Sequence, residues 1–277
     1  MQEEIVVKAP TTEALTPAQI TQKAEDLGVT KTEMSLGRSF ALSIMAGAFI
    51  AMGAMFFSLV VGDPALPFAI QRVLGGFLFC LGLILVVVAG AELFTGNTMI
   101  VMTAASKRIK WSAVWKNWIV VFFGNFLGAL VIVGLVFLSD MSAMNGGQVG
   151  QTMVSVAAGK MHADWLVLFA KGIMCNFLVC LGVWMAYASK TVADKILAVV
   201  FPITAFVACG FEHCVANMFF LPMGALLASC GIAPAGIDPA SVNMLGALYN
   251  WSATVPGNIV GGALMVGMMY WFIYRKK

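Results

Sequence analysis

Long apolar runs separated by short polar segments make up most of this chain of 277 residues. A helix that crosses a bilayer needs an apolar stretch of about 17–25 residues. Six stretches qualify, at about 39–61, 73–105, 119–138, 165–188, 196–230 and 251–274. The second and the fifth are interrupted by polar residues and glycines. The pattern therefore predicts an all-α integral membrane protein with six transmembrane helices, the second and fifth of them broken.

The composition excludes several classes of protein. Hydrophobic residues make up 61% of the chain and charged residues 10%, against roughly 25% charged in an ordinary soluble domain. The mean hydropathy is +0.93. A soluble fold would lack the polar residues to cover its surface, so a soluble enzyme, a nucleic-acid binder and a disordered protein are excluded.

The basic residues lie mostly on one side of the predicted spans. Thirteen share that side: Lys8, Lys23, Lys31, Arg38, Lys107, Arg108, Lys110, Lys116, Lys190, Lys195, Arg275, Lys276 and Lys277. The other side holds Arg72 and Lys160, and Lys171 lies inside the fourth span. The positive-inside rule predicts a multi-pass protein of the cytoplasmic (inner) membrane with both termini in the cytoplasm.

Residues 1–38 carry six acidic residues and no apolar core of a signal peptide. Thr16 and Pro17, followed by Ile20, Ala24 and Leu27, predict a capped, weakly amphipathic helix. It belongs either to a solvated tail or to a surface helix that covers the pore mouth. We therefore expect a cytoplasmic tail at 1–38, a channel domain at 39–274 and a cytoplasmic C-terminus at 275–277.

The sequence contains no sign of covalent or metal chemistry. The six cysteines fall in or at the ends of apolar spans without a CxxC pair, as expected of buried hydrophobic residues. Phosphate-binding loops, dinucleotide fingerprints and hydrolase motifs are absent. We predict neither an enzyme nor a cofactor or metal.

Two pairs of motifs recur in the same order. Gly-x-Glu followed by Asn and Met occurs around Glu92 and again around Glu212. Gly-Asn-x-x-Gly begins at Gly124 and again at Gly257. Three spans per half place the second copy upside down in the membrane. The chain is therefore predicted to be a 3+3 inverted repeat with broken helices near the midplane around a permeation site.

Three ionisable residues lie at the predicted breaks. A glutamate at membrane depth must face a partner, unpaired backbone or water, and Glu92 and Glu212 are predicted to support the broken backbone. His213 is the histidine that lies inside a span, and it titrates in the range needed to pass protons. We therefore predict a pore role for His213.

With these motifs placed, the chain resembles the formate/nitrite transporter family of pentameric channels for small monovalent anions. The resemblance covers about residues 23–274 and depends on Gly90–Thr95, Gly210–His213, Ala216–Met218, Gly257-Asn258 and Lys171–Cys180. It implies six helices, an aquaporin-like protomer with its own pore, a homopentamer, and a loop at the second break that holds Thr95.

The resemblance also assigns pore residues. It implies an outer constriction of Phe79, Val179 and Phe206, and an inner constriction of Leu83, Leu93, Ala216 and Asn217. It implies a polar pair of Thr95 and His213, an outer vestibule with Lys160, and polar walls at Asn176 and Asn258.

These residues suggest a mechanism. Lys160 attracts the anion, His213 with Thr95 supplies a proton, and the neutral acid crosses the apolar rings, because a bare anion there is very costly. A purely electrostatic channel without proton transfer is the alternative. The expected partners are small monovalent anions, protons and the lipid bilayer, with no nucleic acid.

The permeant anion stays open among formate, nitrite, hydrosulfide, acetate and lactate. The loop sequence Thr95-Gly-Asn-Thr departs from the Thr-Ser-Thr of many formate channels and is closer to nitrite and hydrosulfide channels. Two other classes are less favoured. A neutral-solute channel of the aquaporin kind would show two Asn-Pro-Ala motifs, and a membrane electron carrier would need more histidine ligands than two.

Overall fold

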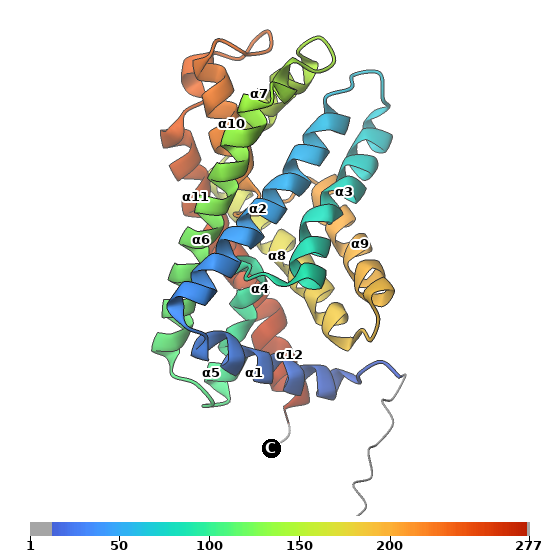
Figure 1. Cartoon of the computed structure of the whole chain (residues 1–277), viewed down its shortest axis with the longest axis vertical. Coiled ribbons are helices and arrows are strands. Elements are labelled where there is room, and N and C mark those ends of the chain that lie inside the picture. Colours follow the sequence, from blue (N-terminus) through green and yellow to red (C-terminus); the bar gives the residue numbers. More distant parts are fainter. Residues whose placement is uncertain (1–12, 276–277) are drawn as a thin grey trace, which may run out of the picture.

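The computed structural model describes residues 13–275, and the described part is helical with no strand (Figure 1). The predicted all-α fold is confirmed. Three of the basic residues counted above, Lys8, Lys276 and Lys277, lie outside the described residues.

The N-terminal helix α1, Pro17–Glu33, begins at the predicted cap. Thr16 and Gln19 exchange side-chain and backbone hydrogen bonds in a capping box. The helix lies crosswise over one end of the bundle (Figure 1), and its Ile20 and Ala24 are buried. It is therefore a docked surface helix and not a solvated tail.

The first half continues with long helices and one break. The bounds are α2 Leu36–Val61, α3 Phe68–Leu85, α4 Phe94–Asn97, α5 Val101–Ala105 and α6 Trp111–Leu138. A π-helical turn, Val86–Gly90, ends α3, and Gly90 has φ +87°, which favours glycine. A short extended loop then leads into α4, and the 3-10 turn Thr98–Ile100 joins α4 to α5.

The second half has the same plan. The bounds are α7 Gln148–Met161, α8 Trp165–Ala188, α9 Val192–Ala208, α10 Asn217–Ser229, α11 Met244–Ile259 and α12 Met269–Tyr274. The π-helical segment Val260–Met268 joins α11 to α12, and 3-10 turns lie at Met141–Ala143 and Pro239–Ser241. The break between α9 and α10 begins at Gly210, with φ +71°.

Within residues 13–275, five helices are long and apolar enough to cross a membrane. α9 and α10 have 17 and 13 residues and lie below that length. The six-span count therefore stays a prediction, with α9 and α10 together as its fifth span. Several helices begin earlier than predicted. In α6, which begins at Trp111, the reason is that the first two turns contain polar and aromatic residues and precede the apolar stretch.

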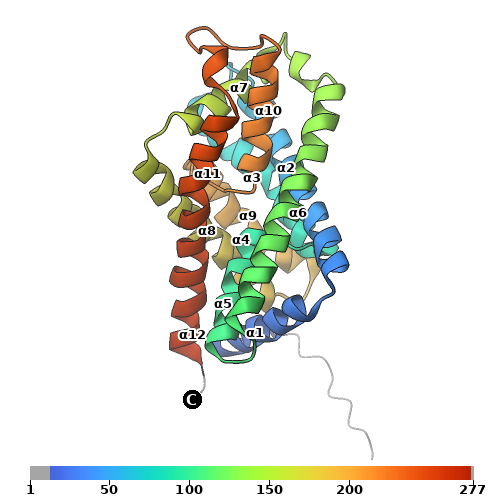
Figure 2. The ribbon, with the colours of Figure 1, turned by 90° about the vertical axis from the view of Figure 1, so that its left-hand side faces the viewer.

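The two halves are inverted copies. α3 and α9 run in opposite directions, α5 ends at the end of the bundle where α1 lies, and α10 ends at the other (Figures 1 and 2). A Cβ atom on Gly128 would lie 1.9 Å from the carbonyl oxygen of Ile44, and one on Gly261 2.2 Å from that of Ile173. The contact of α2 with α6 is therefore packed like the contact of α8 with the π-helical segment that continues α11.

The repeat is longer than three spans per half. The spacing that separates Ile44 from Ile173 also separates Lys31 from Lys160. Lys31 belongs to α1 and Lys160 to α7, and the two helices lie at opposite ends of the bundle (Figure 1). α1 is therefore the counterpart of α7 and part of the repeated unit.

Candidate permeation site

The two breaks meet at the centre of the bundle. Thr95 Oγ1, from α4, lies 3.0 Å from His213 Nε2, in the break after α9. Both residues are buried, with exposed fractions of 0% and 3%. The structure thus brings together the predicted polar pair.

The hydrogen bonds define the tautomer of His213. The backbone N–H of Ala216 donates to Nδ1 at 3.0 Å, so Nδ1 carries no proton. The proton of the neutral ring is then on Nε2, which donates to the Thr95 hydroxyl oxygen. The hydroxyl proton of Thr95 remains available as a donor.

An aromatic barrier adjoins this pair. The rings of Phe79 and Phe206 meet edge to face with centroids 5.7 Å apart. Phe206 also stacks on His213, with centroids 5.7 Å apart and planes 21° apart. The two phenylalanines are buried, so an apolar contact lies directly beside the polar pair.

A cavity opens on each side of the barrier. The Lys160 cavity, about 310 Å³, is lined by Lys160, Arg72, Lys171 and Glu212, and it reaches down to Phe79, Phe206 and His213. The Lys31 cavity, about 550 Å³, is lined by Lys23, Lys31, Arg38, Lys195 and Glu92, and it reaches Leu83 and Leu93. Basic side chains therefore line both approaches to the barrier.

Two of the residues that the resemblance implies for the inner constriction, Ala216 and Asn217, lie on the side of the Lys160 cavity. Leu83 and Leu93 line the Lys31 cavity, but Ala216 lines the Lys160 cavity. The reason is the repeat, because Ala216 takes the place in the second half that Gly96, which lines the Lys31 cavity, takes in the first. Val179 is buried and lines neither cavity.

A lysine–glutamate–asparagine cluster supports the second break. Lys160 Nζ lies 3.0 Å from both carboxylate oxygens of Glu212. Asn217 Nδ2 donates to Glu212 Oε2 at 2.8 Å and to Asn250 Oδ1 at 2.8 Å. Glu212 is thus held by an ion pair and an amide, which supports its predicted structural role, and Asn217 belongs to this cluster.

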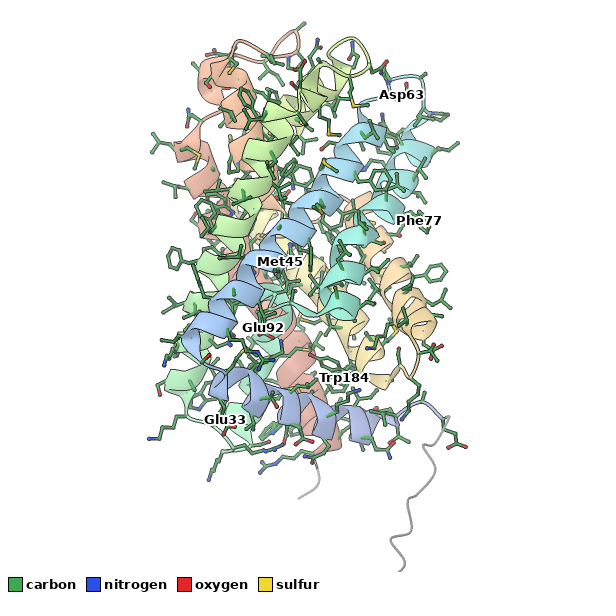
Figure 3. All side chains as sticks on the ribbon, in the orientation of Figure 1. Glu33, Met45, Asp63, Phe77, Glu92 and Trp184 are labelled. Carbon is green, nitrogen blue, oxygen red and sulfur yellow. The ribbon has the colours of Figure 1, made fainter. Side chains whose placement is uncertain are left out.

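The same cluster recurs at the first break. Lys31 Nζ lies 2.7 Å from Glu92 Oε1 and 2.8 Å from Asn97 Oδ1. Asn97 Nδ2 donates to Glu92 Oε2 at 2.7 Å and to Asn117 Oδ1 at 3.0 Å. Glu92 lies close to α1 in Figure 3. Lys31 was not among the predicted site residues, although its spacing from Lys160 is the signal that could have found it.

Two more asparagines tie the breaks to the long helices. Asn258 Nδ2 donates to the carbonyls of Gly172 and Glu212, and Cys214 N donates to its Oδ1. Asn125 bonds the first break in the same way, through Ser43, Glu92 and Phe94. The amide of Asn258 is thus occupied by backbone groups and acts as a brace.

Asn176 is buried beside the first break. Its Nδ2 donates to the carbonyl of Asn258 at 2.6 Å, to Thr98 Oγ1 at 3.1 Å and to the carbonyl of Thr95 at 3.2 Å. Asn176 therefore links the loop that carries Thr95 to the helix that carries Asn258.

Inverted halves, broken helices and two basic-lined cavities around a buried polar pair define an integral membrane transport protein. The sequence pattern of the formate/nitrite transporter family matches residues 18–272, and the chain belongs to this family. The formate channel FocA of Escherichia coli (strain K12) is 39% identical over 273 residues, which cover 95% of each chain.

Two solved structures have the same fold. A pentameric formate channel with formate bound superposes with a TM-score of 0.77 at 37% identity, covering 87% of this chain and 98% of that one. An ion channel of the FNT family superposes with a TM-score of 0.80 at 27% identity, covering 92% and 98%. The protein is a channel-family member and not an enzyme, as predicted.

Proposed function

We propose that the chain is a channel for small monovalent anions of the formate type. The observation that carries this proposal is the buried Thr95–His213 pair, 3.0 Å apart, at an apolar barrier between two basic-lined cavities. The relatives are named formate channels, which supports the same class of permeant.

The barrier selects the form that crosses. An anion that leaves water for the contact of Phe79 and Phe206 loses its hydration, and the cost is many kcal/mol. The same loss of water raises the pKa of a carboxylic acid, because it disfavours the charged form. The permeant therefore crosses Phe79, Phe206, Leu83 and Leu93 as the neutral acid.

His213 assists by orienting Thr95. A neutral imidazole is a poor acid, and a proton on Nδ1 would displace the hydrogen bond from Ala216 N. His213 therefore holds the Thr95 oxygen from one side, and the Thr95 hydroxyl donates to the permeant. The proton that the permeant acquires comes from water in the cavities.

We propose the following test, in proteoliposomes loaded at defined pH. Thr95→Val and His213→Asn remove the donor or its orientation, and we expect about 10- to 100-fold slower formate uptake, as for the loss of one or two strong hydrogen bonds. His162→Asn, at an exposed histidine outside the site, is the matched control and keeps the wild-type rate. Wild-type rate and pH profile in both site variants would contradict the role given to the pair.

The same vesicles identify the permeant. Nitrite and hydrosulfide are tested beside formate because of the Thr95-Gly-Asn-Thr loop, and acetate and lactate because they are larger carboxylates. Glycerol tests the neutral-solute alternative. Uptake of glycerol with exclusion of every anion would refute the proposal.

We also propose an orientation in the cytoplasmic membrane. α1 and the end of α12 lie at the same end of the bundle (Figure 1), and most basic residues lie on that side, which the positive-inside rule places in the cytoplasm. The Lys31 cavity then faces the cytoplasm and the Lys160 cavity faces outward. Labelling of an N-terminal tag by an impermeant reagent outside intact cells would contradict this orientation.

A further inference from the structure

The charge of Lys160 is already neutralised in this structure. Its ammonium lies 3.0 Å from both oxygens of Glu212, and the carboxylate is almost wholly buried. An ion pair of this kind presents a dipole to the cavity, whose field falls off faster with distance than that of a single charge. Lys160 alone therefore gives an approaching anion little long-range attraction.

Two other cations line the same cavity without a carboxylate partner. Arg72 and Lys171 both contribute to its wall, and both are partly exposed. Among residues 13–275, no carboxylate oxygen lies within 4.0 Å of either side-chain charge. Their positive charges are therefore not cancelled by a direct ion pair.

Arg72 also donates hydrogen bonds to the backbone carbonyls at the C-terminal end of α9. Its Nε donates to the carbonyl of Ala208 at 3.0 Å and its Nη2 to that of Val207 at 2.8 Å. These carbonyls belong to the last turn of α9, which ends at the break. A helix C-terminus carries unpaired carbonyls and about half a negative charge, which would repel an anion near His213.

Lys171 lies beside the same break. Its backbone carbonyl accepts a hydrogen bond from Glu212 N at 3.3 Å, so α8 fixes the lysine next to the Glu212 segment. Arg72 and Lys171 thus approach the break from α3 and α8, on the wall of one cavity.

We propose that Arg72 and Lys171 supply the charge that draws the anion into the Lys160 cavity, and that Arg72 also screens the carbonyl end of α9 from it. The proposal deepens the proposed function, because it assigns the attraction within the same channel. Lys160, in turn, is the partner that keeps buried Glu212 from repelling the anion.

The test measures formate uptake against formate concentration at low and high ionic strength. Arg72→Gln and Lys171→Gln should each raise the half-saturating concentration about three- to tenfold at low salt, with little change in the maximal rate, because a single charge across a cavity contributes on the order of 1 kcal/mol. The loss should shrink at high salt, where exposed charges are screened. Lys116→Gln, at an exposed lysine of α6 that does not line this cavity, should match wild type.

Arg72→Lys separates charge from bracing. It keeps the positive charge but loses the paired hydrogen bonds to α9, so we expect most of the low-salt uptake to return. Uptake by Lys171→Gln and Arg72→Gln that matches wild type at low salt would overturn the proposal. So would an Arg72→Lys defect as large as that of Arg72→Gln and independent of salt, which would mark Arg72 as a structural brace only. If wild type itself takes up no anion, the proposed function fails instead.

Discussion

At the scale of single residues, glycines determine how closely the long helices approach. A Cβ atom at Gly128 would lie 1.9 Å from the backbone oxygen of Ile44, and backbone cannot give way as a flexible side chain can. Gly134, on the same helix α6, has nothing within 4 Å of its Cβ position. Gly128 is therefore a packing residue and Gly134 is not.

We predict that Gly128→Ala destabilises the protein by about 1–3 kcal/mol, the usual cost of overpacking. Gly134→Ala is the matched control and should cost less than about 0.5 kcal/mol. The measurement is the midpoint of thermal loss of the folded species on size-exclusion chromatography in detergent. Equal midpoints for the two variants would show that α2 and α6 do not approach as closely as described.

Part of the candidate site could be predicted from the residue types in the sequence alone. Glu92, Glu212 and His213 stand out because ionisable groups are rare in apolar spans. The tautomer of His213 could not be predicted, because it depends on the backbone N–H of Ala216 inside an irregular turn. The same turn places Ala216 in the Lys160 cavity and not with the inner residues.

At the scale of elements, α1 is held to the bundle by polar contacts over long sequence distances. Lys31 pairs with Glu92, 61 positions away, and Lys23 Nζ donates to the carbonyl of Tyr187, 164 positions away. Arg108 pairs with Asp26 at 2.7 Å. The capping signal at Thr16 predicts the helix, but nothing local predicts where it docks. α7 was not predicted as a helix for a different reason, because its glycines and modest apolarity resemble a loop.

The docking of α1 should depend on pH through Lys23. Burial lowers the pKa of Lys23 below its usual 10.5, with the charges of Lys195 and Lys190 acting in the same direction. Between the lowered pKa and 10.5, the docked state binds fewer protons than the undocked state, so docking strengthens as pH rises through this window. Below the window, the contribution of Lys23 is at its weakest and does not vary with pH.

Hydrogen exchange of α1 amides, compared between wild type and Lys23→Met at each pH, measures this effect. We expect the protection of α1 in wild type, relative to the variant, to increase as the pH rises through the window below 10.5 and to stay constant below that window. Amides of α8 provide the internal reference for base-catalysed exchange. A ratio that stays constant over the whole range would contradict the role given to Lys23.

At the scale of the whole molecule, the inverted repeat explains why the two approaches to the barrier resemble each other. Each half contributes a Lys–Glu–Asn cluster, a brace (Asn125 or Asn258) and a broken helix. The motif pairs in the sequence predicted this duplication, and the two halves of the all-α fold contain it. The extension of the repeat to α1 and α7 became visible only when Lys31 and Lys160 were seen in matching clusters.

The halves differ at the centre, and the proposed function depends on that difference. The place of His213 in the second half is taken by Leu93 in the first, and the place of Thr95 is taken by Val215. If the two halves were identical, each pair of matching positions would hold either two polar side chains or none. In the proposed function, one donor pair flanked by apolar residues recognises a single small acid midway, without a deep binding site on either side.

Each protomer should conduct by itself within a homopentamer. The barrier and both cavities are built within one chain, and the related pentameric formate channel is 37% identical. Helix-bundle sequence does not set the number of copies, so the number comes from this likeness. Native mass spectrometry from lipid nanodiscs should give five times 29.5 kDa.

Co-reconstitution of wild type with His213→Phe as mixed pentamers should then lower formate uptake in proportion to the fraction of variant chains. A much steeper fall, with one variant chain silencing a pentamer, would contradict independent conduction by each protomer. Uptake that does not fall with the fraction of variant chains would refute the path past Thr95 and His213.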